Sequence, residues 1–137
     1  MKLNLQIDKL HMLAPFRISG YVFEHAPVLR VELEDGGLRG RGEASGVYYL
    51  DDKPEQMLET LEALRDTIEA GISRAELQQL LPRGGARNAL DCALWDLDAA
   101  RAGKPAWALA GLSQVRPLLT TWTLGACLLY TSPSPRD

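Results

Sequence analysis

The carboxylates that could do chemistry in this chain lie in one stretch with helical periodicity. Asp91, Asp96 and Asp98 fall within it. On a helix Asp91 and Asp98 would share a face, but at a rise of about 1.5 Å per residue they would lie about 10 Å apart. That distance is too long for both to bind one cation without further ligands. We therefore interpret all three aspartates as hydrogen-bonding groups on the surface of a helix.

The remaining reactive side chains are isolated in the sequence. His11 and His25 have no neighbour at the spacing of a metal motif, and we predict neither a zinc site nor a catalytic role for them. Cys92 and Cys127 also lack a cysteine neighbour, which is typical of reduced thiols rather than of a disulfide framework. The residues by themselves therefore predict no catalytic group and no metal site.

Composition narrows the class of protein and of partner. The chain has 137 residues, of which 46% are hydrophobic and 24% charged, as in an ordinary globular domain. A net charge of −3 disfavours a nucleic-acid partner. No apolar run reaches the length of about 18 residues that a membrane span needs, and the N-terminus is unlike a signal peptide. We predict a cytoplasmic protein without a membrane partner, and homo-oligomerisation is left open.

Alternating apolar and polar residues predict three strands before any helix. The first begins at Leu3, slips in phase near Lys9, where we expect a bulge, and ends at Ala14-Pro15. The second covers residues 29–33. Asp35-Gly36-Gly37 is a hairpin signal that leads into a third strand over residues 38–44. Glycines within that third strand permit close approach of another element.

Helical patterns follow the strands. Asp52-Lys-Pro-Glu55 predicts a capped helix that ends at Gly71, and Ser73-Arg-Ala-Glu76 predicts a second, shorter one. A third helix ends at Gly103, with a proline just beyond. Residues 118–124 then have the pattern of a strand from a different sheet. The predicted fold class is α+β: a three-stranded antiparallel meander followed by a helical subdomain.

One stretch resembles a known family. The run Arg87-Asn-Ala-Leu-Asp-Cys-Ala-Leu-Trp-Asp96, with Gly103-Lys-Pro105, resembles the helix that closes the N-terminal domain of enolase-superfamily enzymes of the mandelate racemase and muconate lactonizing type. Pro15-Phe16-Arg17-Ile18 and Gly40-Arg-Gly42-Glu43-Ala44 are also similar to segments of that domain. Glu76-Leu-Gln-Gln-Leu-Leu-Pro82 and Thr120-Thr-Trp-Thr123 most resemble the dipeptide epimerases, the group that contains L-Ala-D/L-Glu epimerase.

The resemblance implies a division of the chain into a capping domain over residues 1–116 and the first strand of a (β/α) barrel over residues 117–126. We interpret residues 127–137 as a non-native tail, because their Ser-Pro pairs and lack of periodicity fit nothing before them. The rest of the barrel is then expected to be missing from this chain.

The resemblance also implies a reaction. In the family, a magnesium ion binds the substrate carboxylate and stabilises the enediolate that forms when a base removes the α-proton. Two lysines exchange that proton, and these lysines and the acidic metal ligands all lie on later barrel strands. The parent protein is thus expected to be an isomerase of the racemase and epimerase type that acts on a dipeptide or N-acyl amino acid. This chain is expected to lack the catalytic residues and to be inactive by itself.

In the family the capping domain contributes two loops that cover the barrel mouth and select the substrate. Here they would be the first lid, residues 15–26, and the second lid, residues 45–53. The resemblance implies that the substrate-binding residues are Arg17, Tyr21, Phe23, Tyr48 and Thr123. Relatives that prefer acidic substrates tend to carry an arginine several residues after the Pro-Phe pair, where this chain has Gly20, Tyr21 and Phe23. We therefore expect glutamate to be disfavoured beside the free carboxylate, and an apolar or cationic side chain to be preferred.

Two alternatives stay open. The chain could cap another member of the superfamily, such as a muconate cycloisomerase, an o-succinylbenzoate synthase or a sugar-acid dehydratase. It could also be a non-catalytic interaction domain that stands alone.

Overall fold

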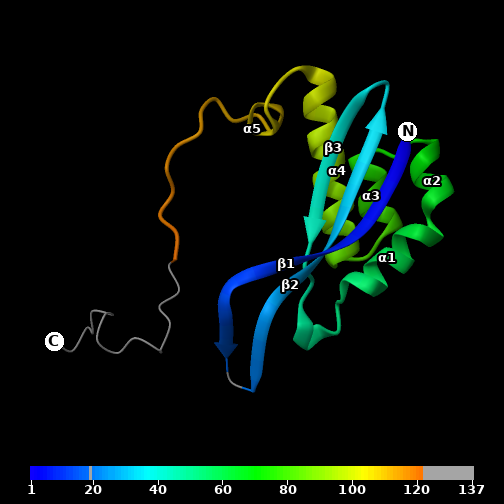
Figure 1. Cartoon of the computed structure of the whole chain (residues 1–137). Helices are drawn as coiled ribbons and strands as arrows, with labels where there is room; N and C mark the ends of the chain where they lie inside the picture. Colours follow the sequence, from blue (N-terminus) through cyan, green and yellow to red (C-terminus); the bar gives the residue numbers. More distant parts are fainter. Residues whose placement is uncertain (19, 122–137) are drawn as a thin grey trace.

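A computed structural model describes residues 1–18 and 20–121 of the chain (Figure 1). Three strands come first: β1 (Lys2–Ile18), β2 (Tyr21–Asp35) and β3 (Leu38–Ala44). A short 3-10 helix, η1 (Tyr48–Leu50), follows. The helices are α1 (Pro54–Ala63), α2 (Arg65–Ala70), α3 (Arg74–Leu80), α4 (Gly85–Ala102) and α5 (Ala106–Leu109). The α+β order predicted from the sequence is confirmed.

The strands form an antiparallel meander in the order β1-β2-β3. Leu3 pairs with Leu33 across the first ladder, and Leu29 pairs with Ala44 across the second. The turn between β2 and β3 contains Gly36 and Gly37 with φ angles of 57° and 83°, a conformation that glycine adopts at low cost. The predicted hairpin signal is therefore confirmed at this turn.

Helix α4 packs directly on β3 because two glycines remove the side chains between them. A Cβ atom added to Gly40 would lie 2.1 Å from the carbonyl oxygen of Ala93, and one added to Gly42 would lie 2.1 Å from that of Ala89. Contact this close between backbones is possible only with glycine on the strand. The predicted close approach is confirmed, and the element that approaches is α4.

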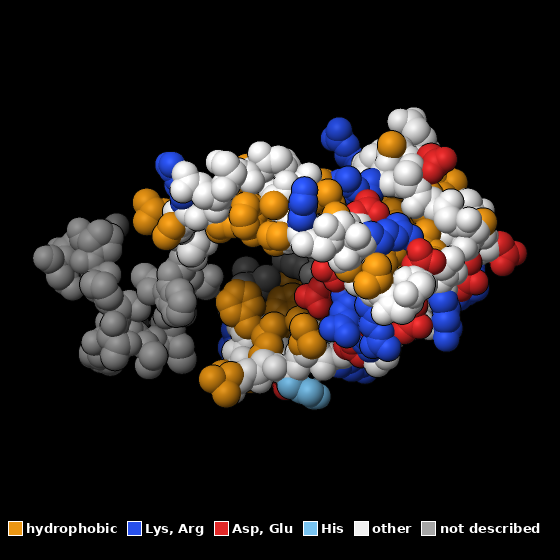
Figure 2. All heavy atoms as spheres, turned by 90° about the horizontal axis from the view of Figure 1, so that it is seen from above, with side chains coloured by type: hydrophobic (Ala, Val, Ile, Leu, Met, Phe, Trp, Pro, Cys, Tyr) orange, Lys and Arg blue, Asp and Glu red, His pale blue; other side chains and the backbone are white. Residues whose placement is uncertain are grey.

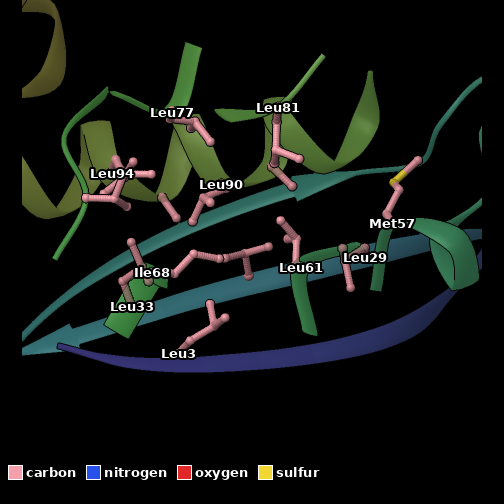
Figure 3. Close-up of a cluster of buried hydrophobic side chains, with 14 of the residues drawn as sticks. Leu3, Leu29, Leu33, Met57, Leu61, Ile68, Leu77, Leu81, Leu90 and Leu94 are labelled. Carbon is pink, nitrogen blue, oxygen red and sulfur yellow. The ribbon is translucent and has the colours of Figure 1, made fainter. Parts of the chain in front are cut away.

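The hydrophobic core lies between the sheet and the helices that cover one of its faces (Figure 3). Where the helices cover the sheet, every second residue of the strands packs against the apolar face of the helices, as the alternation in the strands and the helical spacing predict. The largest fully buried side chains are Leu3, Leu29, Leu33, Met57, Leu61, Ile68, Leu77, Leu90, Leu94, Leu97 and Val31. The hairpin end of β1 and β2 extends beyond this packing (Figure 1).

The helix boundaries confirm two sequence signals and correct a third. Ser73 caps α3 reciprocally with Glu76, and Gly103 ends α4 with a left-handed φ of 61°. The single helix expected up to Gly71 is interrupted at Leu64, which separates α1 from α2. Beyond the break, Arg65 in α2 donates to the carbonyl oxygen of Leu3 at 2.6 Å, so the second segment is tied to the edge strand.

The strands extend further than the sequence predicted. The expectation that Ala14-Pro15 ends the first strand is wrong, because β1 continues to Ile18 and pairs with a β2 that already begins at Tyr21. The irregularity expected near Lys9 lies instead between His11 and Phe16. The first lid is therefore the end of a β-hairpin and not a loop.

The chain leaves the helices after α5 and runs away from the body of the molecule (Figure 1). Residues 113–121 contain no helix or strand. Of the barrel strand expected over residues 118–124, residues 118–121 pair with no strand of the meander, and residues 122–124 lie outside the described part of the chain. That strand and the tail over residues 127–137 stay predictions.

Candidate functional site: a hairpin and a loop

The hairpin of the first lid has two different faces. Phe16 pairs with Phe23, and their ring centroids lie 6.5 Å apart. Tyr21 stacks on Phe23 with a centroid distance of 6.0 Å and an interplanar angle of 15°. We call Phe16, Tyr21 and Phe23 the aromatic face. Arg17 pairs with Val22, and since side chains alternate along a strand, these two point to the opposite side.

A shift in strand register creates the aromatic face. From the pair His11–His25 to the pair Phe16–Phe23, β1 advances by five residues and β2 by two. The extra three residues of β1 form an irregular segment. Before it, odd-numbered residues of β1 pair with odd-numbered residues of β2; after it, even-numbered residues of β1 do so and point to the same side of the sheet. Without it, Leu13 and not Phe16 would lie opposite Phe23.

The same ladder brings the two histidines of the chain together. His11 and His25 are direct cross-strand partners in the last regular pair before the register shift. Their ring centroids lie 6.4 Å apart at an interplanar angle of 58°. The sequence shows them as isolated residues because their pairing depends on the length of the hairpin, which the sequence analysis underestimated.

The second lid is held by its own backbone. Val47 and Asp52 form an isolated antiparallel bridge that closes the turn around η1. Asp51, at a positive φ of 56°, forms an ion pair with Lys53, and the bond from Lys53 is the main reason that the pKa of the Asp51 carboxyl is lowered. Tyr49 remains 72% exposed, so the lid presents an aromatic side chain to solvent.

Asp52 links the second lid to helix α4. Its Oδ2 atom accepts a hydrogen bond of 3.0 Å from the backbone N–H of Gly85, the first residue of that helix. The expected role of Asp52 as the cap of the helix that follows it is therefore wrong. Lys53 occupies that capping position, and its backbone N–H donates to Gln56 Oε1 at 3.1 Å. An acidic group at the start of α4 also complements the helix dipole.

A cavity of about 600 Å³ lies between the second lid, the end of β3 and the start of α4. Its polar lining residues are Glu43, Ser45, Asp52, Arg83 and Asn88. Because the Asp52 carboxylate is already bonded to Gly85, it positions the loop rather than offering a base. Asp52 therefore shapes the wall of the cavity through its bond to α4.

The aspartates of α4 are structural, as the sequence analysis interpreted them. Asp96 accepts from the backbone N–H of Arg41 at 2.9 Å, and Asp98 forms an ion pair with Arg74 at 3.2 Å. Asp91 accepts from Gln78 at 3.2 Å. Within residues 1–18 and 20–121, no group of three or more His, Cys, Asp or Glu side chains is placed to hold a metal ion. Burial, with Asp91 nearby, raises the pKa of the Cys92 thiol, which disfavours the reactive thiolate.

The predicted substrate-binding residues are distributed over separate places. Tyr21 and Phe23 lie together on the aromatic face, and Arg17 lies on the other side of the same hairpin. Tyr48 belongs to η1 in the second lid. Thr123 lies outside the described residues. The sequence analysis missed Phe16, whose place beside Phe23 follows only from the register shift.

The described residues form a three-stranded meander backed by helices, with a projecting hairpin and a second loop. The chain matches the model of the mandelate racemase / muconate lactonizing enzyme N-terminal domain over residues 4–111. It belongs to that family, of the enolase superfamily.

Relatives in this family include several epimerases. The L-Ala-D/L-Glu epimerase of Escherichia coli is 36% identical over 110 residues, which cover 80% of this chain and 34% of that protein. The L-Ala-D/L-amino acid epimerase of Flavobacterium johnsoniae is 32% identical over 132 residues, covering 91% of this chain and 39% of the relative.

A solved structure also matches. It is an enolase family member from Agrobacterium tumefaciens with homology to dipeptide epimerases, described with bound sodium, L-Ala-L-Glu and an ordered loop. The TM-score is 0.75 at 36% identity, over 80% of this chain and 34% of that one. The chain thus spans about a third of the length of the curated relatives first matched. No helix in the described part of the chain is long and apolar enough to cross a membrane.

Proposed function

We propose that the chain is the capping part of a dipeptide epimerase, an isomerase that inverts the stereocentre next to a substrate carboxylate. The observation that carries this proposal is the 36% identity to L-Ala-D/L-Glu epimerase over 80% of the chain. The partner is then a small molecule, a dipeptide or N-acyl amino acid. Two cysteines without a cysteine neighbour agree with a cytoplasmic location.

Magnesium belongs to this proposal as the ion that would stabilise the enediolate in the longer protein. The described residues of this chain do not fit such an ion, since they contain no cluster of three or more possible ligands. We therefore propose that the ligands and the proton-transferring lysines lie outside this chain, and that residues 1–137 alone have no epimerase activity.

The proposed task of this chain is substrate selection by the two lids. Phe16 and Tyr21 on the aromatic face are 42% and 51% exposed, so the hairpin offers apolar surface to a ligand. Arg17 lies on the opposite face from Tyr21 and Phe23, which supports the preference for an apolar or cationic side chain over glutamate. A substrate carboxylate placed on the aromatic face would lack a charge-paired hydrogen bond, at a cost of about 1.5–3 kcal/mol.

A chimera tests both parts of the proposal. Residues 1–116 of this chain would replace the corresponding segment of the Escherichia coli epimerase, and α-proton exchange in deuterated water would be measured on a dipeptide library. We expect exchange, with Ala-Glu disfavoured by about ten- to a hundredfold against the best apolar dipeptide. The isolated chain should show no exchange.

Different outcomes contradict different parts. A folded chimera that exchanges no dipeptide, while the parent enzyme does, would contradict the epimerase assignment. Exchange with Ala-Glu as the best substrate, unchanged by Arg17→Ala, would instead contradict the proposed role of the aromatic face.

A further inference from the structure

We propose that His11 and His25 form a binding site for one divalent transition-metal ion, Zn²⁺, Ni²⁺ or Cu²⁺, which clips the two strands together at the base of the first lid. This inference does not depend on the proposed enzymatic function. It rests on the pairing of β1 with β2, which places the two imidazoles side by side with their ring centroids 6.4 Å apart.

The geometry suits two imidazoles on one ion. His11 and His25 are direct partners in an antiparallel ladder, so their Cβ atoms lie on one side of the sheet at about 4.5–5.5 Å. Two imidazoles that each bind an ion at a metal–nitrogen distance of about 2.0–2.1 Å have ring centroids roughly 5–6 Å apart. The observed separation of 6.4 Å is close to that range, so only a small approach of the two rings is needed for both to bind one ion.

The chemistry of the pair selects the class of metal. Imidazole nitrogen suits Zn²⁺, Cu²⁺ and Ni²⁺, whereas Mg²⁺ prefers oxygen ligands. His11 is exposed and His25 half-buried, so water can complete the coordination shell. Lys9, two residues from His11 on the same side of β1, places its charge about 7 Å along the strand and lowers the affinity without blocking the site.

An ion bound by His11 and His25 would stabilise the pairing of β1 with β2 at the base of the first lid. His11–His25 is the last regular pair before the register shift that creates the aromatic face. An ion bound by both rings favours the paired strands over any opened form, because binding stabilises the state that contains the site. Metal binding therefore holds the base of the hairpin that carries Phe16 and Phe23.

The experiment uses the full chain without an affinity tag, because these are the two histidines of the sequence. Calorimetric titration with ZnCl₂ and with NiCl₂ should give one ion per chain, and MgCl₂ should give no heat of binding. His11→Gln and His25→Gln should each weaken binding at least tenfold. Cys92→Ser, a matched control at another potential ligand, should leave the affinity unchanged.

A second measurement does not depend on variants. The electron paramagnetic resonance spectrum of the wild-type chain with one equivalent of Cu²⁺ should show hyperfine coupling to two imidazole nitrogens. The proposal is overturned by a wild-type chain that binds neither ZnCl₂ nor NiCl₂, or by a spectrum without two nitrogens. Unchanged affinity in His11→Gln or His25→Gln, with circular dichroism showing a folded protein, would overturn it as well.

Discussion

The two ends of strand β2 differ in what surrounds them. Leu29, Val31 and Leu33 are completely buried against the helices, whereas Tyr21 and Val22, on the same strand, are each 51% exposed (Figure 1). Hydrophobic side chains thus serve the core at one end and remain available to a ligand or partner at the other. Figure 2 shows hydrophobic side chains gathered toward one end of the face in view and mostly charged side chains toward the other. One length of the strand therefore stabilises the core, and the other leaves its apolar side chains at the surface.

We call the part of the sheet that packs against the helices the helix-covered end. The largest loss of stability should come from a substitution at its close contact with α4. Gly40→Ala would place a Cβ atom 2.1 Å from the carbonyl oxygen of Ala93 and 2.4 Å from the backbone nitrogen of Leu97. Both atoms belong to the backbone of α4, so the helix has to move away from the sheet. We expect a loss of about 3 kcal/mol or more in the free energy of unfolding, measured by urea denaturation.

Leu38→Ala, on the same strand but 39% exposed, is the control, with an expected loss of about 1 kcal/mol or less. A wild-type urea midpoint for Gly40→Ala would mean that α4 does not pack on β3 as described.

A pair of leucines compares the two ends directly. Leu61 is completely buried, and Leu13, in the irregular part of the hairpin, is fully exposed. Leu61→Ala should cost about 2–5 kcal/mol through lost burial and the cavity that it leaves. Leu13→Ala should change the free energy of unfolding by no more than about 0.5 kcal/mol. Equal losses in the two variants would show that the hairpin is part of the core.

The helix-covered end could largely be predicted from the sequence, because its signals are local. The turn at Gly36-Gly37, the capping box at Ser73 and the C-terminal glycine of α4 each act within a few residues. The periodicity that predicts the core is also local. Each of these signals fixes the structure of the segment in which it occurs.

The hairpin end could be predicted only in part, because its features depend on pairing. The aromatic character of the first lid is visible in the sequence, but the side on which Arg17 lies depends on a register shift. The partner of Asp52 is 33 residues away, and the pairing of His11 with His25 needs the full length of both strands. No short-range pattern records such contacts.

A smaller loss of stability is expected from a substitution where the second lid contacts the start of α4. Asp52→Ala removes the acceptor for the N–H of Gly85 at the start of α4. Loss of such a cap should cost about 0.5–2 kcal/mol. Hydrogen exchange should also speed up at Gly85 and in residues 45–53, because the loop loses its link to the helix.

Asp51→Asn is the matched control for Asp52. It removes an exposed ion pair with Lys53 and keeps a residue that tolerates positive φ, so the change should stay within about 0.5 kcal/mol. If Asp51→Asn destabilised the chain more than Asp52→Ala, the second lid would be held by its surface charges instead.

The smallest effect concerns Glu69, at the edge of the helix-covered end. Its Oε1 atom accepts from the backbone N–H of Leu3 at 2.9 Å and from Arg65 at 3.1 Å. The bond from Leu3 is the largest cause of a lowered pKa for the Glu69 carboxyl, and Arg65 adds to it. Because the pKa is lower in the folded chain than in the unfolded one, this carboxylate stabilises the fold above about pH 4.3, and the contribution disappears as the pH falls through the folded pKa.

Glu69→Gln should therefore destabilise the chain at pH 7, and the difference from wild type should shrink towards pH 3. Urea midpoints measured across that range test the expectation, with Glu59→Gln at an exposed position of α1 as the control. Other carboxyl groups titrate in all three proteins, so only the difference between curves is informative. Glutamine keeps an acceptor for Leu3 and removes the charge. A difference that stays constant from pH 7 to pH 3 would therefore mean that the charge of Glu69 does not contribute to stability.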